Sequence, residues 1–475
     1  MGTRTAEVMA AIRARVASRA LASGDRLPSI RTFAAVMDVS PSTVVEAYDR
    51  LAAEGLIRAR PGSGFYVSTI APPLTLAETG PKLDRALDPF WVSRQSLDAD
   101  PAVAKPGCGW LPADWMPNDA LRRAVRRLAR ADDAVLADYG ATRGPLALRR
   151  LLSRRFAGEG LEAGPDQILL TGSGTQAIDL ICRFLVRPGD AVLVDDPSYF
   201  NFQALLRAHQ ATIVGVPYTP AGPDVERFVE AATVHRPRLY ITNSALHNPT
   251  GATLSPQTAH RLLNAAAAHD MTIVEDDIFA DFEPEPSPRL AALDGLSRVI
   301  RIGSFSKTLS ASIRCGYIAA RPDWIEALID LQVATSFGGV SPVAAELVLA
   351  ALSDGSYRKH LEALRRRLAR ARRDTAASLR MLGISPWLLP RGGFYLWCGL
   401  PDGRDAAAVA RAALRENVLL APGDVFSVSQ TATGFMRFNV AQMSDARIFA
   451  VLERVLRASE REASAQAGGS LRAAR

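Results

Sequence analysis

The residues best suited to covalent chemistry gather around Lys307, in the run Ser304-Phe305-Ser306-Lys307. A lysine amine that loses its proton near neutral pH can attack an aldehyde and form a Schiff base. Small hydroxyl residues beside the amine suit that role, and so does a second cation, for which we expect Arg314. A lysine on an ordinary polar loop is the alternative, because Ser-x-Lys runs are common.

A candidate anion site lies upstream, at Ser173, Gly174 and Thr175. These residues follow the apolar run Leu169-Leu170 and begin a predicted helix that ends near Leu185. Small residues at a helix start let backbone N–H groups approach a phosphate, and the hydroxyls add donors. A plain strand-to-helix turn is the alternative. The spacing is not G-x-G-x-x-G, so a dinucleotide site is not indicated.

Three polar segments follow apolar strands in the same half of the chain. Tyr199 comes after a strand predicted over 191–194, Asn248 after one over 239–242, and Asp276 at the end of a third. Each has a structural alternative, since Asp276 could cap a helix, Tyr199 could lie in a core, and Asn-Pro-Thr-Gly is a good turn. Their occurrence in series with Ser173 and Lys307 makes coincidence improbable.

In this order the segments resemble aspartate-aminotransferase-like proteins of fold type I, over residues 105 to 460. The resemblance implies pyridoxal 5'-phosphate (PLP) as the cofactor. Asp276 would hold its ring nitrogen protonated, Tyr199 would stack on the ring, and Asn248 would donate to its phenolic oxygen. The cofactor-binding residues that the resemblance implies are Tyr139, Ser173, Gly174, Thr175, Tyr199, Asn248, Asp276, Ser304, Ser306, Lys307 and Arg314.

Two outer positions extend the resemblance. Tyr139, in Tyr139-Gly140-x-x-x-Gly144, matches a family tyrosine that reaches the partner subunit's phosphate across a dimer. Arg437 matches the arginine that binds a substrate carboxylate. A guanidinium offers a planar fork to a carboxylate, and an unpaired charge inside an apolar strand would be costly. A buried structural ion pair is the alternative for Arg437.

The first seventy residues predict three helices and a hairpin. Val8, Ile12 and Val16 mark a helix from Arg4 to Ala20; a second helix covers 30–37, and a third begins at Ser40-Pro41. The runs 56–60 and 65–68 flank the turn 61–64 and predict a hairpin. Three helices followed by a hairpin form a winged helix-turn-helix.

This segment resembles the DNA-binding domain of the GntR family, through Gly24-Asp25-Arg26-Leu27-Pro28-Ser29, Leu51-x-x-Glu54-Gly55 and Gly62-Ser63-Gly64. Pro41 and Val45 stand where relatives often carry arginine, so direct base readout by the third helix is expected to be thinner. The residues that the resemblance places at DNA are Arg31, Ser40, Ser42, Thr43 and Gly62.

Composition supports a nucleic-acid partner without deciding it. The net charge of +7 is modest for 475 residues, and the arginine runs 365–367 and 372–373 predict a solvated helix face. The four cysteines have no metal-ligand spacing, so we expect no metal and a reduced, cytoplasmic chain. No signal peptide or long apolar stretch predicts export or membrane insertion.

We therefore predict an α/β chain in four parts. Residues 1–69 form the winged helix, 70–104 a proline-rich linker, 105–460 the aminotransferase-like domain, and 461–475 a disordered tail. The large domain should contain a mixed, mostly parallel sheet with helices on both faces, followed by a smaller C-terminal α/β subdomain. The apolar linker residues Leu87, Phe90, Trp91 and Leu97 are expected to dock onto it.

This order of domains resembles the MocR subfamily of GntR regulators. The resemblance implies a transcription factor that senses PLP, an amino acid or an amine through aldimine formation, as a head-to-tail homodimer on two half-sites of double-stranded DNA. The alternative is a catalytically active aminotransferase with a DNA-binding domain. Ile278 and Phe279 replace a family tyrosine that donates to the cofactor, which favours sensing and predicts at most weak transamination. A vestigial cofactor site is a third possibility.

Overall fold

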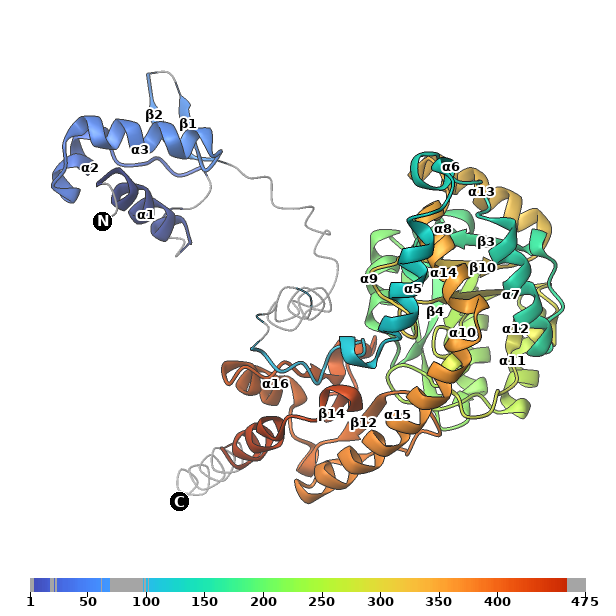
Figure 1. The fold of residues 1–475 in the computed structure, drawn as a ribbon. Helices are drawn as coiled ribbons and strands as arrows, with labels where there is room; N and C mark the ends of the chain where they lie inside the picture. The colour runs from blue at the N-terminus through green and yellow to red at the C-terminus, as the bar shows by residue number, and fades with distance from the viewer. Residues whose placement is uncertain are drawn as a thin grey trace, which may run out of the picture. The chain divides into compact units, whose positions relative to one another are not determined.

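The computed structural model describes residues 4–17, 21, 24–60, 62–68, 97, 100 and 102–458. The chain forms two compact units, Met1–Pro81 and Lys82–Arg475 (Figure 1). Most of the predicted linker and the whole predicted tail, 461–475, lie outside the described residues. Leu97 is 73% exposed, whereas Leu87, Phe90 and Trp91 lie outside the described residues, so the docking of part of the linker onto the large domain stays a prediction.

The first unit has the elements of a winged helix. Val8, Ile12, Val44, Tyr48 and Leu51 are fully buried between its helices, because they fall on the inward faces at helical spacing. The elements are α1 (Arg4–Ala17), α2 (Ile30–Met37), α3 (Pro41–Ala53) and the antiparallel pair β1 (Ile57–Arg60) and β2 (Gly64–Val67). The predicted helices and hairpin are confirmed.

An eight-stranded sheet forms the centre of the second unit. Its strands lie in the order β3 (Ile168–Thr171), β10 (Gly316–Ala319), β9 (Val299–Ser304), β8 (Thr272–Asp276), β7 (Leu239–Thr242), β4 (Ala191–Asp196), β5 (Thr212–Thr219) and β6 (Gly222–Pro223). The strands from β9 to β5 run parallel, whereas β10 and β6 are antiparallel to their neighbours. The predicted mixed, mostly parallel sheet is confirmed.

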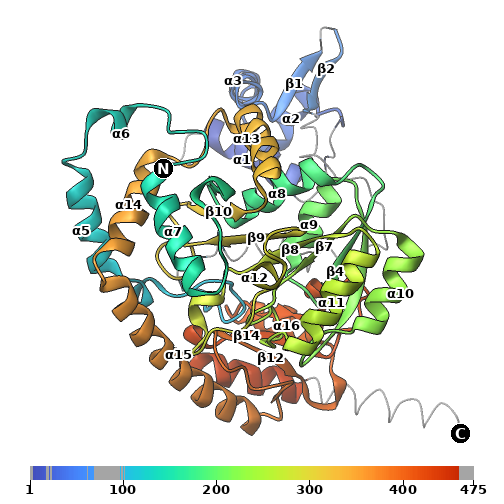
Figure 2. The ribbon, with the colours of Figure 1, turned by 90° about the vertical axis from the view of Figure 1, so that its right-hand side faces the viewer.

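Helices cover both faces of this sheet, as Figure 2 shows. The helices of this region are α5 (Asn118–Leu128), α6 (Asp133–Ala137), α7 (Leu146–Gly158), α8 (Gly174–Leu185), α9 (Phe200–Ala208), α10 (Val225–His235), α11 (Pro256–Ala268), α12 (Leu290–Asp294), α13 (Pro322–Ser336) and α14 (Pro342–Ser353). Alternate residues of β7 point to opposite cores: Leu239 and Ile241 pack with α8, α9 and α13, whereas Tyr240 packs with α7, α10, α11, α12 and α14. Short 3-10 turns lie at η2 (Ala113–Trp115), η3 (Pro165–Gln167) and η4 (Ala280–Phe282).

A smaller C-terminal subdomain follows the long helix α15 (Ser356–Met381). Its antiparallel sheet has the order β11 (Ser385–Pro386), β12 (Tyr395–Gly399), β14 (Phe435–Asn439) and β13 (Ala421–Pro422). Helix α16 (Ala406–Arg415), the 3-10 turns η5 (Pro401–Gly403), η6 (Gly423–Phe426) and η7 (Val440–Gln442), and a helix over 446–458 complete it. None of the described helices combines the length and apolar character that crossing a membrane requires.

The segment before α5 belongs to this subdomain. Ala104 N donates to Asn417 O at 2.9 Å, and Gly107 N donates to Leu419 O at 2.9 Å. These bonds continue the pairing of the small sheet, so residues 104–109 are carried across the subdomain toward the centre of the large sheet.

Candidate functional site

The predicted site residues lie at one edge of the large sheet. In a parallel sheet the carboxyl ends of the strands meet at the same edge, which is where ligands bind in open α/β folds. Tyr199 follows β4, Asn248 follows β7, Asp276 ends β8 and Lys307 follows β9. The sheet therefore brings together residues that are up to 108 positions apart, as the sequence predicted.

Lys307 sits among groups that lower its proton affinity. Its Nζ donates to Gly109 O at 2.6 Å. The pKa of Lys307 is lowered to about 8, mainly by burial and next by the charge of Arg437, whereas Cys108 and Asp276 oppose the shift. The charge of Arg314, the expected second cation, also lowers this pKa but contributes least of these groups. A lysine with this pKa is a ready nucleophile near neutral pH.

Helix α15 also holds the segment that carries Lys307. The Thr308 and Tyr357 hydroxyls are hydrogen-bonded at 2.5 Å, and Tyr357 in turn donates to Asp281 Oδ2 at 2.7 Å. His360 Nε2 lies 3.2 Å from Thr308 O. Thr308 and Tyr357 are both buried. The residue that follows Lys307 is therefore fixed by two side chains from the first turns of α15.

The predicted anion-binding residues also come together. A Cβ on Gly174 would lie 3.7 Å from Ser304 Cβ, so the start of α8 meets the end of β9. Ser304 Oγ and Ser306 Oγ are 2.9 Å apart. Ser173 Oγ accepts a hydrogen bond from Gln176 N at 3.0 Å and caps α8. This helix start and its hydroxyls suit a phosphate, as predicted.

Thr175 and Arg314 flank this anion site from exposed positions. Thr175 Oγ1 accepts from Asn201 Nδ2 at 3.5 Å. Arg314 has a φ of 53°, in the left-handed region, and forms no ion pair within the described residues. A guanidinium without a carboxylate partner remains available to an anionic ligand.

Asp276 is buried, with 7% of its surface exposed, and its Oδ1 accepts from Ile278 N at 3.1 Å. Burial raises the pKa of Asp276 to about 7, against the lowering effect of the hydrogen bonds from Ile278 and Asn243. A buried carboxylate with so high a proton affinity gains strongly from a cationic or protonated partner. That property matches the role predicted at the cofactor's ring nitrogen.

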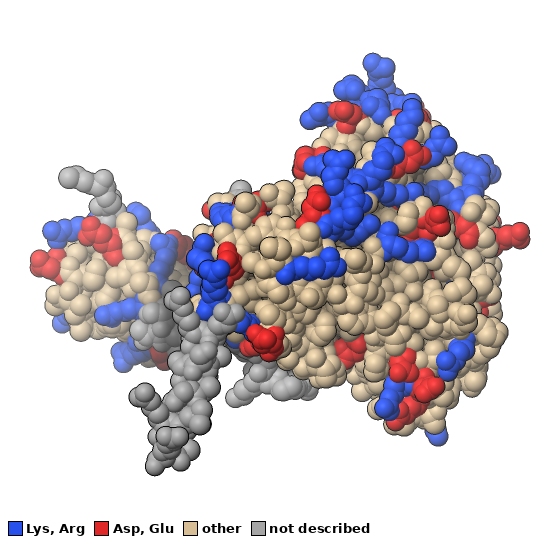
Figure 3. Space-filling model, turned by 90° about the horizontal axis from the view of Figure 1, so that it is seen from below, with Lys and Arg blue, Asp and Glu red and all other residues tan. Residues whose placement is uncertain are grey.

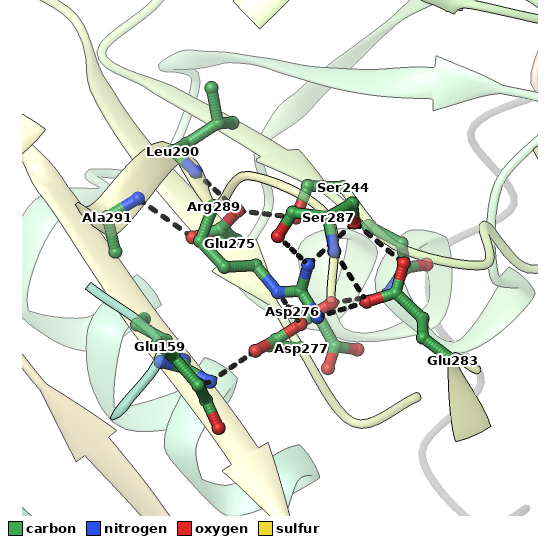
Figure 4. A network of polar contacts seen from close by, with 12 residues as sticks. Glu159, Ser244, Glu275, Asp276, Asp277, Glu283, Ser287, Arg289, Leu290 and Ala291 are labelled. Atoms are coloured by element: carbon green, nitrogen blue, oxygen red, sulfur yellow. Dashed lines mark hydrogen bonds and ion pairs between the residues drawn. The ribbon is translucent and has the colours of Figure 1, made fainter. Parts of the chain in front are cut away.

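The two neighbours of Asp276 are bound by other buried groups, as Figure 4 shows. Arg289 Nε donates to Asp277 Oδ1 at 2.7 Å, and Arg289 Nη2 to Glu283 Oε2 at 2.6 Å. Arg301 also pairs with Asp277, and Glu275 accepts from the backbone N–H groups of 290 and 291. Neither arginine was predicted from the sequence. Three consecutive acidic residues at the end of an apolar strand were a signal that a buried cation faces at least one of them.

Arg437 is the buried cation at the centre of the site, with 1% of its surface exposed. Its Nη1 donates to Asn248 Oδ1 and its Nη2 to Gly107 O, both at 2.8 Å, while its Nε has no hydrogen-bond partner. The guanidinium carbon lies 4.3 Å from the centroid of the Tyr395 ring and 4.7 Å from that of Phe426. None of the described carboxylates pairs with Arg437, so the alternative of a structural ion pair is wrong for these residues.

Gly109 marks the point on which the reactive groups converge. A Cβ built there would lie 3.4 Å from Tyr395 Oη, 3.9 Å from Arg437 Nη2 and 4.0 Å from Lys307 Nζ. A phenol, a guanidinium and an amine thus face one small volume that only a glycine leaves open. Gly109 and Tyr395 were not predicted from the sequence. The two glycines in Gly107-Cys108-Gly109 were a signal that the backbone there approaches other groups closely.

Tyr199 and Asn248 occupy positions that agree with their predicted roles. The Tyr199 ring packs against Phe200 and Phe202, with centroids 5.0 and 5.5 Å apart. Burial raises the pKa of Tyr199, and the charges of Arg437 and Asp276 act on its hydroxyl. Asn248 accepts from Arg437 through its oxygen and so keeps its NH₂ group as a donor.

The two positions that replace the family tyrosine differ in surroundings. Phe279 is 3% exposed, and its ring packs against Phe282, Phe394 and Tyr395 in the core of the small subdomain. Ile278 is only half-buried. Neither side chain can donate a hydrogen bond.

Tyr139 lies apart from these residues, 79% exposed, with its ring 5.2 Å from that of Phe337. It touches none of the site residues in the described part of the chain. A tyrosine that binds the phosphate of a partner subunit would be exposed in a single chain. The role predicted for Tyr139 across a dimer stays a prediction.

In the first unit the predicted DNA-contacting residues lie on the outside. Arg31, Ser40 and Ser42 are exposed, and Ser40 Oγ caps α3 by accepting from Thr43 N at 3.2 Å. Gly62 has a φ of 74° in the turn between β1 and β2, which favours glycine. Val45 is 39% exposed on α3. The start of α3 and the tip of the wing are thus both accessible.

Two family models match this chain. Residues 112–455 match the aminotransferase class I and II family, and residues 4–67 match the bacterial regulatory proteins of the gntR family. The chain is 31% identical to the uncharacterized HTH-type transcriptional regulator YdcR of Escherichia coli (strain K12), covering 90% of this chain and 93% of that protein. It is 26% identical to the HTH-type transcriptional regulator NorG of Staphylococcus aureus (strain USA300), covering 84% and 92%.

Solved structures show the same fold for the second unit. The α-aminoadipate aminotransferase LysN of Thermus thermophilus, complexed with N-(5'-phosphopyridoxyl)-L-leucine, is 25% identical and has a TM-score of 0.71. The match covers 77% of this chain and 94% of that one. PLP is the cofactor that this domain implies, and the residues described above fit it. The chain thus belongs to the HTH-type transcriptional regulators that join a gntR-family DNA-binding domain to an aminotransferase class I and II domain, the arrangement of the MocR type.

Proposed function

We propose that this protein regulates transcription in response to an amino acid that binds at the PLP site through both its amine and its carboxylate. The observation that carries this proposal is Arg437, a fully buried guanidinium without a carboxylate partner among the described residues. An uncompensated buried charge is strongly unfavourable, so a site that keeps one is suited to an anionic ligand.

Different residues of the chain would bind different parts of PLP. When bound, PLP supplies an aldehyde that condenses with primary amines and a ring that withdraws electrons. Lys307, with its pKa lowered to about 8, holds a nucleophilic amine at that aldehyde. Asp276 holds a proton at the ring nitrogen, and Ser173, Ser304 and Ser306 lie where the phosphate would be bound.

The carboxylate of the effector would lie against Arg437. Its guanidinium is fixed in orientation by Asn248, by Gly107 O and by the rings of Tyr395 and Phe426. A guanidinium that cannot rotate loses little entropy when it binds a carboxylate, which favours ligands with that group over simple amines.

An effector titration tests this proposal. Wild type and Arg437→Ala, both loaded with PLP, are titrated with a panel of amino acids and with matching amines that lack the carboxylate, and visible absorbance reports the reaction. We expect Arg437→Ala to retain PLP but to respond to amino acids no better than to the amines. Lys307→Ala is the control that loses the absorbance band of the lysine-bound cofactor. An unchanged amino acid response in Arg437→Ala would point to PLP itself or a simple amine as the effector.

The winged helix of the first unit would bind the DNA. A cytoplasmic homodimer, head-to-tail, would place two winged helices on paired half-sites of double-stranded DNA. The exposure of Arg31 and Ser42 at the starts of α2 and α3 supports phosphate contacts there, and the exposure of Tyr139 supports a role across the dimer.

Arg31→Ala is expected to weaken DNA binding on most sequences, because a phosphate contact carries no sequence information. It should reduce the salt dependence by about one unit in the slope of log K against log salt. The measurement is fluorescence anisotropy with a duplex from the region upstream of the gene. An isolated half-site that binds as tightly as the whole region would contradict the paired arrangement.

A working aminotransferase with a DNA-binding domain remains the second candidate function, favoured by the lowered pKa of Lys307 and the intact set around Asp276. Turnover with the same amino acid panel and a keto acid decides between the two. Rates of roughly 10 per second would support the enzyme. The absence of a hydrogen-bond donor at Ile278 and Phe279 favours slower turnover than that.

A further inference from the structure

The positive charge of this chain is concentrated outside its DNA-binding domain. Helix α15 carries nine Arg and Lys residues against two Asp and Glu, and α5 carries four against one. These two helices therefore have a net charge of +10, which exceeds the +7 of the whole chain. Residues 1–69, by contrast, carry nine basic and six acidic residues.

Both helices pack against α14 in the second unit, and an ion pair links each of them to the segment that precedes the other. Arg123 on α5 pairs with Asp354 at 3.4 Å, just before α15, and Arg367 on α15 pairs with Asp114 at 2.7 Å, just before α5. The guanidinium of Arg367 also lies 3.7 Å from the centroid of the Trp115 ring. Figure 3 shows many Lys and Arg side chains gathered into a band on one face of this unit, with some acidic side chains among them.

The outer basic residues of these two helices are exposed and form no ion pairs within the described part of the second unit. We call Arg126, Arg127, Lys359, Arg366, Arg370 and Arg373 the basic surface. All six are exposed, and none forms an ion pair within residues 102–458. Packing instead uses other residues of α15, since Arg365 donates to Asp281 O and Arg372 to Gly393 O. The sequence analysis interpreted these arginine runs as a solvated helix face, and their exposure agrees with that.

We propose that the basic surface binds the phosphate backbone of duplex DNA, as a second DNA-contacting region of the regulator. This inference rests on the proposed function, since the partner is the DNA that the winged helix recognises. Residues 359 to 373 of a helix span about 21 Å, a length along which B-DNA presents several phosphates. One guanidinium can donate two hydrogen bonds to two oxygens of the same phosphate, whereas a lysine ammonium acts as a point charge. An arginine-rich surface therefore suits a phosphate backbone better than a lysine-rich one.

Electrostatic balance favours this partner. Phosphate contacts supply most of the affinity of non-specific DNA binding, at about 0.9 units of salt dependence for each contact. A winged-helix region with a net charge of only +3 has limited capacity for such contacts, whereas the two helices carry three times that charge. The winged helix would then select the sequence, and the basic surface would add affinity on any sequence.

Salt dependence of DNA binding by the full-length protein tests this proposal. The variant is Arg366→Gln, Arg370→Gln and Arg373→Gln together, because glutamine keeps helix propensity and removes only charge. The probes are a duplex of about 60 base pairs from the region upstream of the gene and a duplex of the same length with random sequence. We expect the slope of log K against log salt to fall by up to about 2.7 per protomer on both duplexes.

Two further variants control for charge and position. The same three positions changed to lysine should restore the slope, since the slope depends on how many phosphate charges the protein neutralises. Three exposed arginines elsewhere in the second unit, changed together as Arg207→Gln, Arg238→Gln and Arg261→Gln, should leave the slope unchanged. An unchanged slope in the α15 variant, or an equal fall in this control, would overturn the inference.

Failure of the inference and failure of the proposed function look different. If wild type binds neither duplex, or Arg31→Ala has no effect, the regulator itself is in question. If Arg31→Ala weakens binding but the α15 variant keeps the wild-type slope, only the second DNA-contacting region is refuted, and an acidic protein partner becomes the occupant to seek.

Discussion

Adding one methyl group at Gly109 is expected to block the effector and leave the rest of the protein intact. The new Cβ would lie at 3.4 to 4.0 Å from Tyr395 Oη, Arg437 Nη2 and Lys307 Nζ, which are ordinary van der Waals distances. The Gly109 backbone is not among those with a positive φ. Alanine at such a position stabilises a protein by about 0.4–1 kcal/mol, so Gly109→Ala should fold and retain PLP.

The methyl group would nevertheless occupy the space that a carboxylate between Arg437 and Tyr395 needs. Loss of one charge-assisted hydrogen bond weakens binding by about 1.5–3 kcal/mol, which corresponds to an affinity about 10- to 150-fold lower. Absorbance titration of the PLP-loaded protein with its amino acid effector measures this loss. Thermal unfolding of the same samples measures stability.

Gly107 provides the matched control, two residues away. A Cβ on Gly107 would lie 2.5 Å from the backbone atoms Ala421 N and Leu420 C, so the main chain of the small sheet would have to move. We expect Gly107→Ala to lower the unfolding midpoint, at a cost of about 1–3 kcal/mol. If Gly109→Ala were destabilised as much as Gly107→Ala, or bound the effector as tightly as wild type, the geometry assigned to Gly109 would be refuted.

Two other predictions concern proton affinity. The pKa of Asp276 is raised from 3.8 to about 7 by burial, so the folded, cofactor-free protein binds an extra proton between these values and its stability should fall as pH rises through them. Asp276→Asn should remove that part of the pH dependence, measured as unfolding midpoints from about pH 4 to 7; parallel curves for both proteins would contradict it. A hydroxyl that donates to the cofactor's phenolic oxygen should lower the pKa of the aldimine between Lys307 and PLP. Titration of the visible absorbance band of Ile278→Tyr and Phe279→Tyr against pH measures this pKa. Phe279→Tyr should also lose about 1–3 kcal/mol of stability if its hydroxyl stays unpaired among the aromatic rings, and identical band pKa values in wild type and both variants would remove the argument for a sensor.

The elements of the fold could be predicted where local signals were strong. The bounds of α2 agree at both ends, because Ser29 caps its start and its apolar residues repeat at helical spacing. The order of Ser173, Asn248, Asp276 and Lys307 was enough to predict that they serve one site. Each of them ends a strand or lies within six residues of its end, so its position depends on a few neighbouring residues only.

The centre of the site could not be predicted in the same way. Arg437 bonds to Gly107, which is 330 positions away, and Lys307 bonds to Gly109, which is 198 positions away. Only the tertiary fold brings these segments together. The same limit explains why the sequence predicted the smaller effect of Arg314, which is close in sequence to Lys307, but not the larger effect of Arg437.

The buried arginines beside β8 have a consequence for how the chain folds. Glu275, Asp276 and Asp277 are nearly equivalent as chemical groups, and a shift of one residue in strand pairing would exchange the side chains on the two faces of the sheet. Such a shift would turn Asp276 toward the packed helices and bring Glu275 and Asp277 to the cofactor edge. Arg289 and Arg301 oppose the shift that would put Ile278 in the place of Asp277, because two buried guanidinium groups would lose that carboxylate. The opposite shift would put Val274 in the place of Glu275 and leave the N–H groups of Leu290 and Ala291 without their acceptor. The partners of Glu275 and Asp277 together therefore fix the register and select which of the three acidic residues faces the cofactor.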